Sequence, residues 1–174
     1  MTSPFLIEPL SSGHDRASFS SGSEPLDQYL RRQASQDVRR RVTACFVAFD
    51  QEARRLAGYY TIAAANIRLD ALPENIAKRL PRYPSVPAVR IGRLAVDLEF
   101  QDRGLGGALL ADAMTRAITT DIMAFAMVVD AKDDAAIAFY RHHGFVPCTD
   151  TPDTLFLPLK TAEKLLPSPP TKRT

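Results

Sequence analysis

Cysteine is scarce in this chain: only Cys45 and Cys148 occur among 174 residues. The two lie far apart, and neither belongs to a Cys-x-x-Cys pair or has a histidine at metal-ligand spacing. This pattern argues against a disulfide framework and against a zinc site. We therefore expect two buried free thiols in a cytoplasmic protein without a bound metal ion.

Long apolar runs are also absent. None approaches the roughly 20 residues that a membrane span needs, and residues 1–10 lack the basic start and apolar centre of a signal peptide. With 45% apolar and 24% charged residues, the composition is that of an ordinary soluble protein. The length suits one domain with a full core, for which we expect residues 1–166, followed by a disordered tail at 167–174.

The net charge is only +2, so total charge does not by itself indicate a nucleic-acid-binding protein. The basic residues are nevertheless clustered, and most are arginines, whose planar fork suits phosphate. Such a cluster fits a nucleic acid, an acidic partner, or simply the solvated faces of helices. Its members are Arg31, Arg32, Arg39, Arg40, Arg41, Arg54, Arg55, Lys78, Arg79, Arg82, Arg90 and Arg93.

Hydrophobic patterns predict a chain in which strands alternate with helices. The predicted strands are 5–9, 42–49, 56–67, 91–96, 124–130, 145–148 and 154–159. The predicted helices are one through Leu26 and Leu30 that continues over 34–41, and others at 74–80, 105–119, 133–143 and 160–166. Pro81, Pro84 and Pro87 predict an irregular segment, which is either a substrate loop or only a connection.

Residues 90–110 are the most informative stretch. They read as an apolar strand, a polar bend, and a helix that starts with Gly104, Gly106 and Gly107. Glycine lets a ligand approach the backbone, and the free N–H groups of a helix start attract anions. The spacing Gln101-x-x-Gly104-x-Gly106 is neither the dinucleotide fingerprint nor a P-loop. The sequence therefore predicts an anion site of a different kind.

This spacing resembles the pyrophosphate loop of the GNAT acetyltransferase superfamily. The preceding strand, Leu94-Ala95-Val96-Asp97, and the later stretch from Phe139-Tyr140 to Gly144-Phe145 fit the same pattern. The resemblance implies the GNAT fold, an α/β (α+β) architecture. Its central mixed, mostly antiparallel sheet is splayed at the central strand and flanked by helices. It also implies an enzyme that uses acetyl-CoA.

Within that superfamily, the sequence looks like the acetyltransferase toxins of type II toxin–antitoxin modules. The matching stretches are Phe19-x-x-Gly22-x-x-x-Leu26-Asp27-x-Tyr29-Leu30, Gly58-Tyr59-Tyr60-Thr61, Gly92 to Asp97, Gln101 to Leu110, Val128 to Ala131, and Leu155 to Leu159. The resemblance implies acetylation of the α-amine of aminoacyl-tRNA, which inhibits translation, a ribbon-helix-helix antitoxin, and a homodimer.

Two other readings stay open. One is a GNAT N-acetyltransferase that acts on a small-molecule amine or on a protein or peptide N-terminus. The other is a catalytically silent member that binds coenzyme A or a partner protein. The intact glycine loop and Tyr140 argue against the silent member.

The resemblance also implies roles for individual residues. The backbone of the strand before the loop would pair with pantetheine, and the Val96 N–H would stabilise the oxyanion. Tyr140 would give its proton to the departing thiolate. The predicted acetyl-CoA-binding residues are Leu94, Ala95, Val96, Gln101, Asp102, Arg103, Gly104, Leu105, Gly106, Gly107, Asp133, Phe139 and Tyr140. The predicted tRNA-binding residues are Arg39, Arg40, Arg41, Arg90 and Arg93.

Two positions depart from the pattern of the family. Asp102 stands where the toxin branch often has glycine, and Asp133 stands where many members carry an asparagine that contacts pantetheine. No general base is evident: Glu99 reads as a solvated charge, and His142 and His143 as solvent-facing residues at a helix end. An α-amine, with a pKa of about 7.7–8.0, is roughly one-quarter neutral at pH 7.4 and needs little help.

Overall fold

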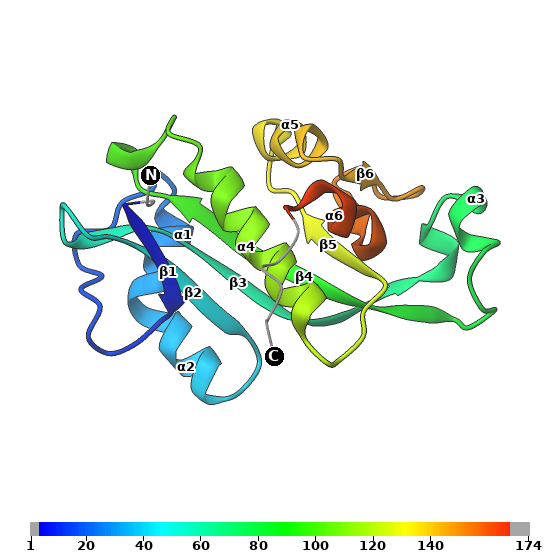
Figure 1. Cartoon of the computed structure of the whole chain (residues 1–174), viewed down its shortest axis with the longest axis horizontal. Helices are drawn as coiled ribbons and strands as arrows, with labels where there is room; N and C mark the ends of the chain where they lie inside the picture. The colour runs from blue at the N-terminus through cyan, green and yellow to red at the C-terminus, as the bar shows by residue number, and fades with distance from the viewer. Residues whose placement is uncertain (1–3, 168–174) are drawn as a thin grey trace. The chain divides into compact units, whose positions relative to one another are not determined.

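The computed structural model, described over residues 4–167, contains a seven-stranded sheet with the order β1-β2-β3-β4-β5-β7-β6. Helices accompany the strands, which confirms the predicted α/β class (Figure 1). The chain divides into two units, residues 1–65 with 89–113, and residues 66–88 with 114–174. The predicted tail starts at Pro167, and its other residues, 168–174, lie outside the described part of the chain.

The first unit is built on antiparallel strands. β1 (Phe5–Pro9) pairs with β2 (Ala44–Asp50), and β2 pairs with β3 (Arg55–Arg68), whose last residues belong to the second unit. A register shift interrupts the second pairing between Ala48 and Phe49. These three neighbouring strands can be followed in Figure 1. The predicted strand 5–9 is thus confirmed residue for residue.

A helical segment between β1 and β2 contains one wide turn. Helix α1 (Glu24–Gln28) is followed by a π-helical turn (Tyr29–Gln33) and then by α2 (Ala34–Arg39). The Ala34 N–H donates to the carbonyl of Tyr29, one residue further back than in an α-helix. Tyr29, Leu30 and Ala34 are consequently all buried, in a core that includes Phe19 and Tyr59.

Adjacent residues of β3 face opposite sides of the sheet. Tyr59 packs with Phe19 and Tyr29 on one side, whereas Gly58 faces the start of helix α4 (Leu105–Thr119). A Cβ atom on Gly58 would lie 2.9 Å from the side chain of Leu109. The missing side chain therefore allows α4, predicted with the same bounds, to pack closely on the strand.

The second unit contains the remaining short elements and the last turns of α4. They are a 3₁₀ turn (Leu69–Ala71), α3 (Glu74–Ala77), β5 (Ala126–Asp130), α5 (Asp134–His142), β6 (Val146–Pro147), β7 (Thr154–Pro158) and α6 (Leu159–Leu165). β7 pairs antiparallel with both β5 and β6. No helix within residues 4–167 is long and apolar enough to cross a membrane.

Two predictions near the prolines were wrong. Strand β4 (Ser85–Val96) begins at Ser85 rather than at residue 91, and it contains Pro87. Proline removes a hydrogen-bond donor but keeps its acceptor, and the Pro87 carbonyl accepts the N–H of Phe125 at 2.8 Å. Helix α3 begins after its N-cap Pro73, as the predicted range 74–80 requires, but it ends early, at Ala77.

Candidate active site

Strand β4 runs directly into a buried carboxylate, Asp97, which organises the loop that follows. This residue is only 1% exposed. Its oxygens accept the N–H groups of Ser20 and Glu99, each at 3.0 Å, and the guanidinium of Arg55 at 3.1 Å. A buried carboxylate is tolerated when its acceptor sites are filled in this way. The start of the loop is therefore fixed by side-chain chemistry.

The side chain of Gln101 also holds the loop in place. Its Nε2 donates to the carbonyl of Val96 at 3.0 Å and to that of Ser21 at 3.2 Å. In parallel, the Leu98 N–H donates to the carbonyl of Ser20 at 2.9 Å. The side chain of Gln101 thus binds protein backbone and joins the loop to Ser21 and to the end of β4.

Phe100 anchors the middle of the loop and is 4% exposed. The guanidinium groups of Arg55 and Arg103 lie 5.5 Å and 5.3 Å from the centre of its ring, within cation–π range. Arg103 itself is exposed. The guanidinium of Arg103 therefore lies against the Phe100 ring just before the helix begins.

The entry into α4 uses two left-handed residues, Asp102 with φ +63° and Gly104 with φ +77°. Nothing lies within 4 Å of the position that a Cβ would take on Gly104, so the backbone there is accessible. The first turn of α4 contains no acidic residue, and its N–H groups lie at the positive end of the helix dipole. These features fit a bound diphosphate, such as that of coenzyme A.

Asp102→Gly is expected to lower the KM for acetyl-CoA about two- to fivefold, because it removes a negative charge from this helix start. It should also raise the free energy of unfolding by about 0.5 kcal/mol, since glycine adopts a positive φ freely. Asp102→Asn is the matched control, because it removes the charge but keeps a side chain. Steady-state kinetics and thermal melting would check both effects. A raised KM in both variants would contradict the expectation.

The predicted acetyl-CoA residues Leu94, Ala95 and Val96 lie at the end of β4 in the first unit. Asp133, Phe139 and Tyr140 lie in the second unit, at the N-cap of α5 and within it. The carboxylate of Asp133 accepts the N–H of Ala136 at 2.8 Å and so caps the helix. The side-chain oxygen of an asparagine could accept the same N–H, so either residue can act as the N-cap at position 133. The cap also sets the direction of the helix that carries Phe139 and Tyr140.

Tyr140 is 6% exposed and packs between two aromatic rings. The ring centres of Phe139 and Phe145 lie 5.0 Å and 5.3 Å from its own. Burial raises the pKa of its phenol above the ordinary value, so the hydroxyl stays protonated at neutral pH. Within residues 4–167, no group of the protein is recorded as a hydrogen-bond partner of this hydroxyl. The proton is therefore available to a ligand.

Other predicted features are confirmed. Both cysteine side chains are buried. His143 ends α5 as its C-cap and His142 is exposed. Glu99 is exposed, as expected, but it also pairs with Arg55 at 2.6 Å.

The predicted tRNA-binding arginines differ in how firmly they are held. Arg39, Arg40 and Arg41 are exposed around the end of α2. Arg90 and Arg93 are half-buried on β4. The guanidinium carbon of Arg93 lies 3.4 Å from the centre of the Tyr29 ring. The first unit thus brings Arg93 onto an aromatic surface and leaves the run at 39–41 in solvent.

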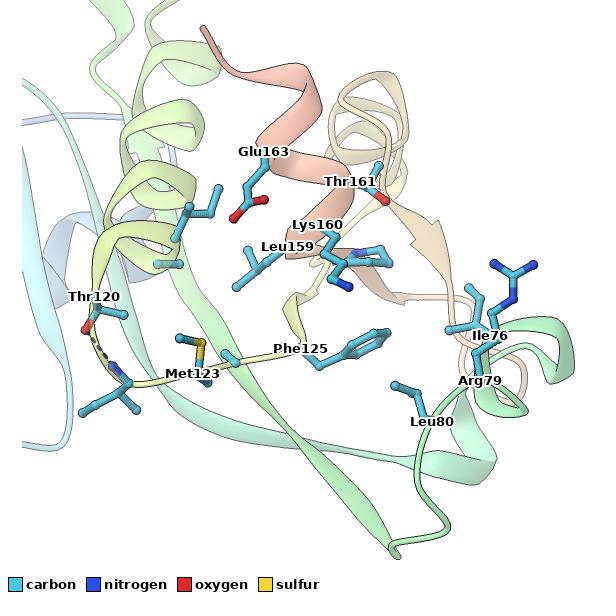
Figure 2. A pocket seen from close by; sticks show the side chains of 15 residues that line it. Ile76, Arg79, Leu80, Thr120, Met123, Phe125, Leu159, Lys160, Thr161 and Glu163 are labelled. Atoms are coloured by element: carbon cyan, nitrogen blue, oxygen red, sulfur yellow. Dashed lines mark hydrogen bonds between the residues drawn. The ribbon is translucent and has the colours of Figure 1, made fainter. Parts of the chain in front are cut away.

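A separate pocket of about 750 Å³ lies in the second unit. Figure 2 shows Leu80, Met123, Phe125 and Leu159 around it, with the amino group of Lys160 directed towards Phe125. None of the residues predicted to bind acetyl-CoA or tRNA lines this pocket. It is consequently distinct from the site described above.

Sequence reasoning missed two parts of the site. Arg55 carried no signal, because it lies in a hairpin and meets Asp97 only in the folded chain. The resemblance placed Tyr29 only in a family-like motif, and nothing in the sequence pairs this buried ring with Arg93. Both contacts join positions that are distant in sequence.

Comparison with known proteins places these features in context. The sequence profile of the acetyltransferase (GNAT) family matches residues 13–145. A protein of Mycobacterium tuberculosis (strain ATCC 25618 / H37Rv) named tRNA-acetylating toxin is 35% identical over 159 residues, which cover 90% of this chain and 93% of that protein.

Two solved structures are also similar. AtaT complexed with acetyl-methionyl-tRNAfMet has a TM-score of 0.83 and 29% identity, over 92% of this chain and 98% of that one. A tyrosine-to-phenylalanine mutant of AtaT bound to the C-terminus of the antitoxin AtaR and to acetyl-CoA has a TM-score of 0.75 and 25% identity. That match covers 94% of this chain and 98% of the other.

Proposed function

The chain belongs to the acetyltransferase (GNAT) family, and we propose that it transfers an acetyl group from acetyl-CoA to the α-amine of aminoacyl-tRNA. As the toxin of a toxin–antitoxin pair, it would thereby inhibit translation. The similarity over 90% of the chain to a tRNA-acetylating toxin is the observation that carries this proposal. The glycine loop and Tyr140 supply the matching chemistry.

For the acyl donor, the proposed binding groups belong to β4 and α4. The backbone of residues 94–96 would pair with the pantetheine arm as an added strand would. The N–H groups of the first turn of α4 and the guanidinium of Arg103 would hold the pyrophosphate. Asp97 and Gln101 support this arrangement because they fix the loop between the two elements.

The reaction joins the amine nitrogen to the acetyl carbon and breaks the carbon–sulfur bond. The neutral α-amine attacks, and the Val96 N–H would stabilise the oxyanion that forms. Tyr140 would donate its proton to the departing thiolate, and the proton lost by the amine goes to solvent. Because roughly a quarter of an α-amine is neutral at pH 7.4, no carboxylate base is required.

The proposal extends to partners. A relative has been solved bound to the C-terminus of its antitoxin, and we propose an antitoxin of the ribbon-helix-helix type for this chain. We further propose that the toxin is a homodimer and acts in the cytoplasm, where aminoacyl-tRNA is found.

Induced expression in a bacterial host tests the activity. We expect growth arrest, with N-acetyl-aminoacyl-tRNA detected in the tRNA pool by mass spectrometry. Co-expression with the neighbouring antitoxin gene should restore growth. Unimpaired growth, together with acetylation of small amines or peptide N-termini by the purified protein, would instead establish the alternative substrate class.

A further inference from the structure

The stacked pair of Arg93 and Tyr29 has no role in the acetyl transfer described above. Arg93 lies on β4, and Tyr29 opens the π-helical turn. At 3.4 Å from guanidinium carbon to ring centre, the guanidinium is in direct contact with the face of the ring. A guanidinium that lies on a ring is held by one face, which leaves the N–H groups along its edge able to donate.

Those N–H groups are not used by the protein. Within residues 4–167, the Arg93 side chain forms no hydrogen bond or ion pair with the protein. Three other arginines of this unit do make such bonds: Arg16 and Arg31 donate to backbone carbonyls, and Arg55 donates to two carboxylates. Arg93 is therefore a positioned cation whose donors remain available.

The ring beneath it is firmly fixed. Tyr29 is 7% exposed and stacks on Tyr59, with ring centres 6.5 Å apart and planes at 15°. Its hydroxyl donates to Asp37 at 2.8 Å, and the other carboxylate oxygen accepts the Gln33 amide at 2.9 Å. These two hydrogen bonds lower the pKa of Asp37, so the carboxylate is charged at neutral pH.

The negative charge of Asp37 weakens the local positive potential, but it leaves the Arg93 donors unpaired. Its oxygens bind Tyr29 and Gln33, and no ion pair between Asp37 and Arg93 is recorded within the described part of the chain. Asp37 therefore acts on the ring. It holds the hydroxyl end of Tyr29, whereas stacking on Tyr59 sets the plane of the ring on which the guanidinium lies.

We propose that Arg93 binds a phosphate group of a nucleotide substrate and that Tyr29 is the positioning residue that holds the guanidinium for it. A planar fork with free edge donors matches two phosphate oxygens. The inference rests on the proposed function, which supplies two sources of such a phosphate. They are the backbone of aminoacyl-tRNA and the 3′-phosphate of coenzyme A.

The test compares four variants of the full chain, assayed with purified aminoacyl-tRNA and with acetyl-CoA or acetyl-dephospho-CoA. Arg93→Ala removes the phosphate donor, and Arg93→Lys keeps the charge without the planar fork. Tyr29→Leu removes the ring, whereas Tyr29→Phe keeps the ring and loses only the hydroxyl. Thermal melting shows which variants are folded.

If the phosphate belongs to tRNA, Arg93→Ala should raise the KM for aminoacyl-tRNA about tenfold. It should also reduce the slope of log KM against log salt by about one. The KM for acetyl-CoA and kcat should stay at wild-type values. If the phosphate belongs to coenzyme A, the KM for acetyl-CoA should rise instead, and acetyl-dephospho-CoA should remove the difference between variant and wild type.

The positioning role of Tyr29 leads to a second expectation. Tyr29→Leu and Arg93→Lys should raise the same KM, by about three- to tenfold, while Tyr29→Phe should stay close to wild type. Tyr29→Leu should add nothing in an Arg93→Ala background. Should Tyr29→Leu not fold, Arg93→Lys still tests the planar fork.

Unchanged KM values and salt slopes in Arg93→Ala would overturn the inference, provided that the wild-type protein acetylates aminoacyl-tRNA. If the wild-type protein shows no such turnover, the proposed function fails first. The measurement on wild type therefore separates the two failures.

Discussion

Tyr140→Phe is expected to lower kcat for aminoacyl-tRNA acetylation by about 10²–10⁴-fold, the usual contribution of a general acid. The substitution removes one hydroxyl that has no recorded protein partner, and it keeps the ring that packs on Phe139 and Phe145. The melting temperature and the KM for acetyl-CoA should therefore stay close to wild type. Steady-state kinetics on the purified proteins would measure both parameters.

Phe145→Leu provides the control for packing. It takes away a ring next to Tyr140 without touching the hydroxyl, so it should reduce stability more than turnover. The pH profile adds a further check. Activity should rise as the α-amine loses its proton, near pH 8, and should not fall again below about pH 10. The reason is that burial keeps the pKa of Tyr140 above its ordinary value.

A normal kcat in Tyr140→Phe would assign the proton to another group or to water. A raised KM for acetyl-CoA with unchanged kcat would give the tyrosine a binding role only. Either outcome would remove Tyr140 from general acid catalysis.

Asp97→Ala is expected to lower the free energy of unfolding by about 3 kcal/mol, which is a loss of about 6–12 °C in melting temperature for a chain of this size. The variant leaves two backbone N–H groups and the Arg55 guanidinium without their acceptor. The loop that precedes α4 should loosen as well. We therefore also expect a higher KM for acetyl-CoA in the folded fraction.

Glu99→Ala is the matched control, since it removes the second carboxylate on Arg55. Its side chain is 71% exposed, and exposed ion pairs contribute only about 0–1 kcal/mol. Differential scanning calorimetry would compare the two variants. Similar melting temperatures for both would mean that the buried carboxylate is not what fixes the loop.

The sequence predicted those parts of the fold that local patterns control. The bounds of β1 and α4 follow from apolar periodicity and from glycines at a helix start, and both were predicted correctly. Strand β4 was predicted too short because Pro87 looks like a strand breaker in isolation. Only the folded chain shows that its carbonyl accepts the Phe125 N–H while its missing donor is tolerated.

The candidate site also contains residues that the sequence predicts and contacts that it does not. The glycines and Tyr140 were recognisable because ligand chemistry restricts which residues can stand there. The contacts that support the loop could not be recognised in the sequence. Asp97 bonds to Ser20, which is 77 positions away in the chain, and to Arg55, which is 42 positions away. Such pairs depend on which segments meet in space. Gln101 shows the difference most clearly, because its motif marks the loop in the sequence, whereas only the fold shows that its side chain donates to the carbonyls of Val96 and Ser21.

The wide turn at Tyr29–Gln33 makes the length of this segment as important as its composition. Deleting one residue there would convert the turn into regular α-helix, which in itself is the more favourable conformation. The turn holds one residue more than an α-helical turn, so the residues after the deletion would face nearly the same way around the helix axis. Asp37 would then follow Tyr29 by about two α-helical turns and would stay within reach of its hydroxyl. A single-codon deletion in the regular helix α2 before Asp37 should instead rotate this carboxylate by about 100° and remove its hydrogen bond to Tyr29.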